Sequence, residues 1–118
     1  MEYLLLIHSD DEPLKKMPKD TQAAQIAAYR AYTQALQEAG VLRGANRLRP
    51  ASSATTVRLR DGKTQVQNGP FIETREELGG YYLIDVDDLD AALSWAARCP
   101  AAASGAMDVR PVWPMGEY

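Results

Sequence analysis

The 118-residue sequence has few of the residues that form disulfides or zinc sites, and no long hydrophobic segment that could span a membrane. It contains one cysteine, Cys99, and one histidine, His8, which excludes an internal disulfide and argues against a zinc site built from Cys and His. The longest aliphatic run, Leu4–Ile7, is far shorter than the roughly 18 residues that a membrane span requires. We therefore expect a cytoplasmic protein that is neither exported nor inserted into a membrane.

An excess of positive charge and a glycine-rich phosphate loop are also missing. Thirteen Lys and Arg side chains stand against 16 Asp and Glu, which gives a net charge of −3, whereas a duplex-binding protein needs a basic face. The sequence has no spacing of metal ligands and no Ser, His and Asp order typical of a hydrolase. It thus predicts no direct nucleic-acid binding, no metal and no cofactor.

What is present is typical of one folded domain over residues 1–118, with 46% hydrophobic and 25% charged residues. Periodicity and turn residues predict four strands, two helices and a hairpin. Asp20 or Thr21 is expected to cap the first helix and Gly40 to end it. The predicted strands cover residues 3–8, 41–49, 81–86 and 107–112, and the helices cover 21–39, with apolar positions Ile26, Tyr29, Tyr32 and Leu36, and 89–98.

The clearest local signal is Asp61-Gly62 between two alternating segments, residues 56–60 and 63–67. Asp-Gly favours a two-residue type I′ hairpin turn, because both central residues need positive φ. That register places Val57 opposite Val66 and Leu59 opposite Thr64. One side of the hairpin is then apolar, and the other carries Arg58, Arg60, Lys63 and Gln65.

Without the hairpin, the order is strand, helix, strand, strand, helix, strand, which is typical of a ferredoxin-like α+β fold. Both helices cover one face of such a sheet. We expect the strands at 3–8 and 81–86 to be parallel neighbours, with 107–112 antiparallel beside the first. Alternation assigns to the helix-covered face the residues Tyr3, Leu5, Ile7, Tyr82, Ile84, Val86, Met107 and Val109.

The opposite face is too aliphatic at its centre to remain in water, so we expect a homodimer in which it is covered by a second copy. In the expected parallel arrangement, His8, Asp85 and Asp108 converge at one end of the sheet. Polar groups at the rim of an apolar space are typical of a small-molecule site. This face holds Leu4, Leu6, His8, Tyr81, Leu83, Asp85, Asp108, Arg110 and Val112.

Three segments carry a resemblance to a known family: NGPFIETREELGGYYLIDV at 68–86, AARCP at 96–100 and VRPV at 109–112. They resemble the YCII-related proteins of the DGPF subgroup. The resemblance implies a dimeric α/β barrel of ferredoxin-like protomers. It also implies a link to extracytoplasmic-function sigma factors, with which such proteins are often encoded.

Two departures from the family pattern bear on chemistry. Asn68 stands where the subgroup motif has an aspartate. Enzymatic members of the wider family are similar in pairing a histidine at the first helix entry with an aspartate before the proline that ends the second helix. Here that entry reads Asp20-Thr21-Gln22, and Cys99 precedes Pro100, so this acid/base pair is absent.

Two functions remain open. In the first, the dimer binds an unknown small organic ligand and acts as an isomerase- or lyase-like enzyme, with His8 as proton carrier and Asp85 as its orienting carboxylate. In the second, it is a non-catalytic interaction module beside a sigma factor, using its basic hairpin. As alternatives to their site roles, His8 is interpreted as a satisfied strand-end residue and Phe71 as a plug in the core. Candidate ligand-binding residues are Asn68, Phe71, Tyr81, Asp108 and Arg110.

Overall fold

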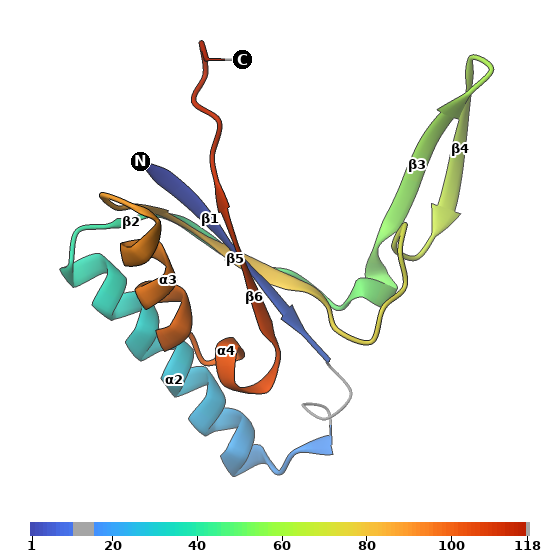
Figure 1. The fold of residues 1–118 in the computed structure, drawn as a ribbon. Helices are drawn as coiled ribbons and strands as arrows, with labels where there is room; N and C mark the ends of the chain where they lie inside the picture. Colours follow the sequence, from blue (N-terminus) through green and yellow to red (C-terminus); the bar gives the residue numbers. More distant parts are fainter. Residues whose placement is uncertain (11–15, 118) are drawn as a thin grey trace.

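The computed structural model describes residues 1–10 and 16–117, and within them it has the expected mixed α+β architecture (Figure 1). A four-stranded sheet carries two longer helices, and a two-stranded hairpin projects from it. None of the described helices is long and apolar enough to cross a membrane. The elements are β1 (Glu2–Ser9), α2 (Lys19–Glu38), β2 (Leu42–Arg47), the 3-10 turn η1 (Ala51–Ser53), β3 (Thr55–Arg60), β4 (Lys63–Asn68), β5 (Glu77–Asp85), α3 (Leu89–Arg98), α4 (Ala101–Ser104) and β6 (Ala106–Pro111).

The main sheet has the strand order β2-β5-β1-β6, which confirms the ferredoxin-like fold. The expected parallel pairing of β1 and β5 is wrong, because these strands are antiparallel, as are β1 with β6 and β2 with β5. The reason is topological. The crossover through α2 makes β2 parallel to β1, and β5 returns beside β2 in the opposite direction, so β5 lies antiparallel to both.

The hydrophobic core lies between one face of this sheet and the two longer helices, as predicted. Leu5, Ile84 and the α2 residue Leu36 are fully buried there. Met107 and Val109 of β6 pack against its margin. The remaining buried members are Tyr3, Ile7, Tyr32, Tyr82, Val86, Ala92, Ala96, Cys99 and Ala101.

Aromatic side chains join the two helices to the sheet. The ring of Tyr32 on α2 meets Tyr82 of β5 edge-on, with ring centroids 5.1 Å apart. Its hydroxyl donates to the carbonyl of Trp95 on α3 at 2.8 Å. Thr33 and Tyr82 share a further hydroxyl hydrogen bond of 2.8 Å. The buried phenols are thus hydrogen-bonded, which offsets the cost of removing them from water.

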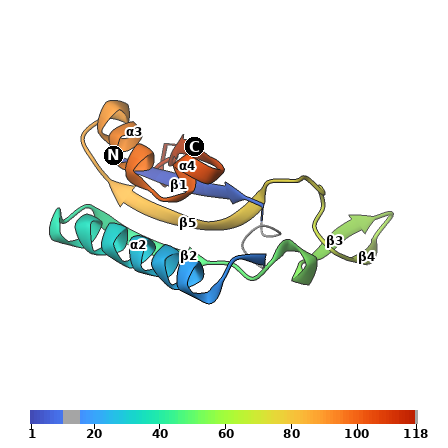
Figure 2. The ribbon, with the colours of Figure 1, turned by 90° about the horizontal axis from the view of Figure 1, so that it is seen from below.

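Strands β3 and β4 form a separate arm that stands away from the body in both ribbon views (Figures 1 and 2). Val57 pairs with Val66, as predicted. The turn residues Asp61 and Gly62 have φ of 52° and 75°, so both have the positive φ that a type I′ turn requires. The arm adds to the span of the molecule, whose radius of gyration is 16.4 Å, against about 13.5 Å for a compact chain of this length.

Several local expectations are wrong. Phe71 does not enter the core; it is 62% exposed, and its ring lies 4.2 Å from the guanidinium carbon of Arg58. Helix α2 begins after Pro18 without a side-chain cap, and Ile26 in its first half is exposed. A short helix, α4, occupies part of the expected loop before β6. The second long helix, α3, is capped by Asp88, whose side chain accepts from the backbone N–H of Ala91 at 2.9 Å.

Candidate functional site

The candidate site lies on the sheet face turned away from the helices, called here the open face. Leu6 of β1 is flanked by Asp108 of β6 and Tyr81 of β5. Leu4 is flanked in the same way by Arg110 and Leu83. Leu4, Leu6, Tyr81 and Leu83 are only half-buried, in contrast to their neighbours on the covered face. The polar side chains of Asp108, Arg110 and Tyr81 therefore border an aliphatic centre formed by Leu4, Leu6 and Leu83.

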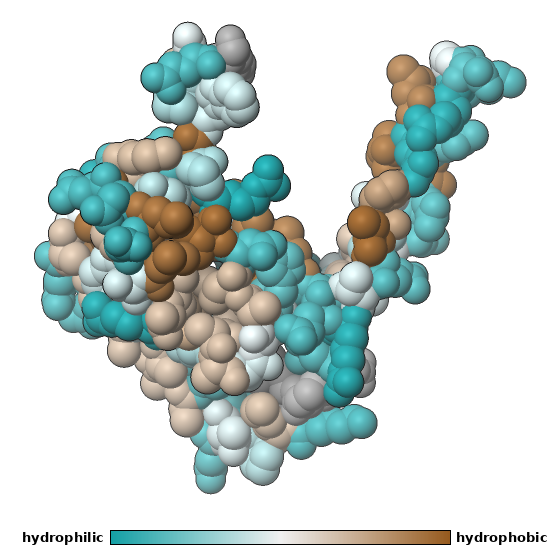
Figure 3. All heavy atoms as spheres, in the orientation of Figure 1, coloured by the Kyte–Doolittle hydropathy of each residue, from teal (hydrophilic) through white to brown (hydrophobic). Residues whose placement is uncertain are grey.

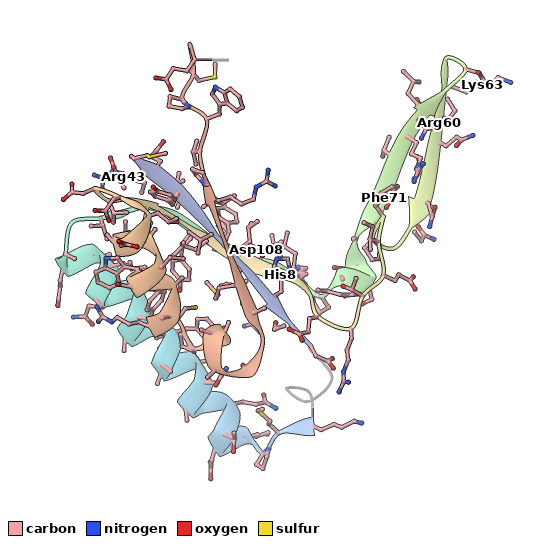
Figure 4. The ribbon with its side chains drawn as sticks, viewed as in Figure 1. His8, Arg43, Arg60, Lys63, Phe71 and Asp108 are labelled. Carbon is pink, nitrogen blue, oxygen red and sulfur yellow. The ribbon has the colours of Figure 1, made fainter. Side chains whose placement is uncertain are left out.

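His8 and Asp108 form the polar contact most relevant to chemistry (Figure 4). The imidazole Nε2 lies 3.0 Å from a carboxylate oxygen of Asp108, and the side chains are 28% and 62% exposed. A neutral imidazole that donates its Nε2 hydrogen to the carboxylate keeps Nδ1 as a proton acceptor. The pair therefore has the composition of a general base and its orienting carboxylate.

The backbone around His8 is constrained by both neighbouring strands, β5 and β6. A bulge interrupts the β1–β5 register between Ile7 and His8, and bulges re-aim side chains, often beside functional sites. On the other side, a Cβ at Gly105 would clash with the carbonyl oxygen of His8. Only glycine allows α4 to turn into β6 so close to β1, and this turn sets the start of the strand that carries Asp108. No pattern in the sequence signals this role of Gly105.

Asp85 does not lie beside His8, so the expected His8–Asp85 pair is wrong. Asp85 is opposite Glu2 in the antiparallel register, six residues along β1 from His8, which is about 20 Å. Its carboxylate accepts a 2.8 Å hydrogen bond from the amino group of Met1. Arg43, which is labelled in Figure 4, lies 3.7 Å from the same carboxylate. The hydrogen bond from the Met1 amino group, together with the positive charges of that group and Arg43, lowers the pKa of Asp85 below its usual value.

Tyr81 occupies the centre of the open face and has a partner that sequence reasoning did not find. Asn46 of β2 donates from its side-chain amide to the Tyr81 hydroxyl oxygen at 2.8 Å. The two residues are opposite one another in the β2–β5 register. Nothing in the spacing of the sequence signals this pairing, because it depends on the register of strands 35 positions apart.

The other two candidate ligand-binding residues belong to the arm and its base. Asn68 is the last residue of β4 and pairs with Thr55, and Phe71 follows on the exposed link toward β5. Cys99 is buried, and burial raises the pKa of its thiol, which argues against a reactive thiolate. Among the described residues, no three His, Cys, Asp or Glu side chains gather to hold a metal ion.

The fold and the open face define a small ferredoxin-like α+β protein with a single imidazole–carboxylate pair on its exposed sheet surface. Comparison with known families matches residues 1–116 to the YCII-related domain, and the chain belongs to this family. It is also similar to an uncharacterised protein of Rhizobium meliloti (strain 1021), with 36% identity over 114 residues, which covers 95% of this chain and 92% of the relative.

Proposed function

We propose that the protein is a homodimer that binds a small organic ligand on its open face and moves a proton on that ligand with His8. The observation that carries the proposal is the His8–Asp108 pair at the edge of an aliphatic surface. This replaces the expected His8–Asp85 arrangement with a carboxylate that is within hydrogen-bond distance. A cytoplasmic setting is part of the proposal, since the one thiol is buried and unpaired with another cysteine.

The amount of accessible surface supports a second copy. The chain exposes 8502 Å², whereas a compact monomer of 13.0 kDa is expected to expose about 6,300 Å². A standard interface removes about 800 Å² from each partner. The excess is thus larger than one such interface. The aliphatic open face offers a self-complementary surface for a two-fold contact.

The chemistry follows from the geometry of the pair. Asp108 holds the Nε2 hydrogen, so Nδ1 of His8 can accept a proton from a ligand C–H or O–H group, and the imidazolium formed is stabilised by the carboxylate. Arg110, two residues along β6, supplies a positive charge for an anionic ligand group. Proton removal and return at a different atom is isomerisation; removal with departure of a leaving group is elimination. We therefore propose isomerase- or lyase-like activity.

His8 provides its own reporter because it is the only histidine in the chain. Native mass spectrometry of protein taken from cells should give twice the 13.0 kDa protomer mass plus any retained small molecule. NMR of the single imidazole should then show a shift when a library of small carboxylic acids, lactones and enols is titrated. Asp108→Asn should weaken or abolish that shift, while the control Asp87→Asn, on the exposed turn before α3, should leave it unchanged. A monomer with an unresponsive imidazole would contradict the proposal.

A non-catalytic interaction module is the second candidate, and the arm favours it. Arg60 and Lys63 lie near the exposed arm tip (Figure 4), where they could meet an acidic protein surface. The sigma-factor link comes with the DGPF subgroup, whose motif here reads Asn68-Gly69-Pro70-Phe71. Binding to a purified extracytoplasmic-function sigma factor should then be lost in Arg60→Glu/Lys63→Glu, with His8→Gln as the unaffected control.

A further inference from the structure

The arm exposes its apolar side more fully than any strand of the main sheet. Val57, Leu59 and Val66 are 64%, 66% and 66% exposed, and hydrophobic residues are visible along the arm in Figure 3. An isolated two-stranded hairpin is at best marginally stable in water and needs further packing. Within the described chain the main sheet and the arm are separate sheets, so this packing does not come from a neighbouring strand.

The other side of the arm, which carries the basic residues, already has a contact within the chain. Arg58 stacks on Phe71 at 4.2 Å, which covers part of the basic side. At the base, the backbone N–H of Gly69 donates to the carbonyl of Ala54 at 2.8 Å, and the Thr56 hydroxyl donates to the carbonyl of Gly69 at 2.9 Å. These contacts hold the base of the arm together and leave its apolar side as the surface that needs a partner.

Charge distinguishes the surfaces on which the arm could pack. Residues 55–68 hold three cations and one anion, a net charge of +2 in a chain of net −3, so the rest of the chain carries −5. Two arms packed against each other would bring like charges together, whereas an arm on the body of another copy would bring opposite charges together. The open face carries the carboxylates Glu2, Asp85 and Asp108 together with the cations Arg110 and, beside Asp85, Arg43.

The strands that lead into the arm also favour the open face. β2 runs into the arm after Arg47, and β5 returns from it at Glu77. Arg47 pairs with Gly80, and Leu78 pairs with His8, so the arm leaves the sheet at the end that carries His8. In a two-fold dimer each arm is therefore attached next to its own His8–Asp108 pair and extends beyond the sheet.

We infer that the apolar side of each arm packs across the open face of a second copy and forms a wall of that copy's ligand site. The inference rests on the proposed homodimer and ligand site. Each site is then built by two chains: one supplies His8 and Asp108, and the other supplies Val57, Leu59 and Val66. The second chain makes the site apolar and excludes water, which strengthens the interaction between the imidazole and its carboxylate.

Site-directed cross-linking tests this geometry directly. Leu59→Cys places a thiol on the arm, and Leu6→Cys places one on the open face opposite Asp108. Native Cys99 is buried, so the unmodified protein provides the background. The two variants are mixed, allowed to exchange subunits and mildly oxidised. We expect a disulfide-linked dimer of one variant with the other in the mixture.

Two results would overturn the inference. Cross-linking of Leu59→Cys only to itself would show arm-to-arm packing. Cross-linking of Leu59→Cys to Ile26→Cys instead of Leu6→Cys would place the arm on the exposed surface of α2, where a shallow hollow lies beside Ile26 and Ala27.

A second measurement keeps the test independent of thiol chemistry. The triple variant Val57→Thr/Leu59→Thr/Val66→Thr has a β-branched residue at each of the three positions, which favours the strand, but removes the apolar side of the arm. We expect sedimentation to show at least a tenfold weaker dimer and the imidazole shift on ligand addition to be lost. The matched control, Gln65→Thr/Gln67→Thr on the other side of β4, should preserve both. A monomeric wild type would refute both the homodimer and the packing of the arm on a second copy. If the wild type is a dimer and the triple variant remains an equally stable dimer, only the packing of the arm is refuted.

Discussion

The two faces of the main sheet come from the same strands but have different environments. On β1, Tyr3, Leu5 and Ile7 are buried under the helices, while Leu4 and Leu6 between them are only half-buried. At these positions the side chains on both faces are apolar, so composition does not distinguish the two faces. They differ because the helices pack on one face and leave the other uncovered. All the ionisable groups proposed for chemistry lie on the face that the chain's own helices leave uncovered. The covered face stabilises the protomer, and the open face is available for a partner and a ligand.

The largest difference between the two faces should appear in the free energy of unfolding when two adjacent residues of β5 are replaced by alanine. Ile84→Ala removes a fully buried side chain and should cost about 2–5 kcal/mol of unfolding free energy at every protein concentration. Leu83→Ala, on the open face, should cost less than about 1.5 kcal/mol in dilute protein. Its cost should grow as the concentration rises, because it weakens the proposed dimer contact. Urea unfolding at two concentrations, well below and above the dimer dissociation constant, measures both.

Equal costs for the two variants, independent of concentration, would remove the distinction between the faces. A concentration dependence for Ile84→Ala alone would reverse it. Leu4→Ala, which lies opposite Leu83 on β1, provides a second position on the open face and should behave as Leu83→Ala does.

The next largest effect on stability is expected at the end of the sheet, where Gly105 lies close to the backbone carbonyl of His8. Gly105→Ala would bring a methyl group into a clash with the His8 carbonyl, so β6 must shift, at a cost of about 1–3 kcal/mol. Because that shift moves Asp108, the NMR signal of His8 should change as well. Gly44→Ala is the control: its Cβ would meet only the Leu83 Cβ at 3.9 Å, an ordinary contact. Unchanged stability and an unchanged imidazole signal in Gly105→Ala would contradict this role.

The fold was largely predictable because it depends on local signals. Alternation identified the covered face, and Asp61-Gly62 fixed the register of the arm. The site was less predictable. The predicted parallel direction of β1 and β5 places Asp85 beside His8, whereas the antiparallel pairing in the structure places it at the far end of the sheet. The alternation of both strands is as predicted. Periodicity specifies which face a residue occupies, but it does not specify which end of a neighbouring strand lies beside it.

Phe71 and Asn46 illustrate two further limits. An aromatic residue after a Gly-Pro turn is compatible with the core, and only the position of the arm shows that Phe71 stacks on Arg58 instead. Asn46 lies in a strand of mixed composition, so its hydrogen bond to Tyr81 has no sequence signature. Contacts between distant segments, which sequence patterns do not encode, decide both positions.

The covered face should also give the larger response to alkaline pH. Burial raises the pKa of Tyr29 to about 12, and it raises the pKa of Tyr32 and Tyr82 as well. Below pH 10 these phenols are neutral in both states. Above pH 10 the unfolded chain releases its protons first, so folding stability should fall between pH 10 and about 12. Urea midpoints from pH 9 to 11, with Tyr29→Phe as the variant that lessens the slope, measure this loss.

On the open face, Asp85 should give the smallest effect, with the opposite pH sign. Its pKa is lowered in the folded protein, chiefly by the hydrogen bond from the Met1 amino group, so the contribution is present above the unfolded value of 3.8 and is lost as pH falls through the folded pKa. Because the carboxylate is exposed and screened, Asp85→Asn should lower the melting temperature at pH 7 by only a few degrees or less. It should also flatten the decline in stability below pH 4, whereas the exposed neighbour Asp87→Asn should not. A large loss of dimer in Asp85→Asn would place this carboxylate in the contact between the two copies and would contradict its assignment as a minor contribution.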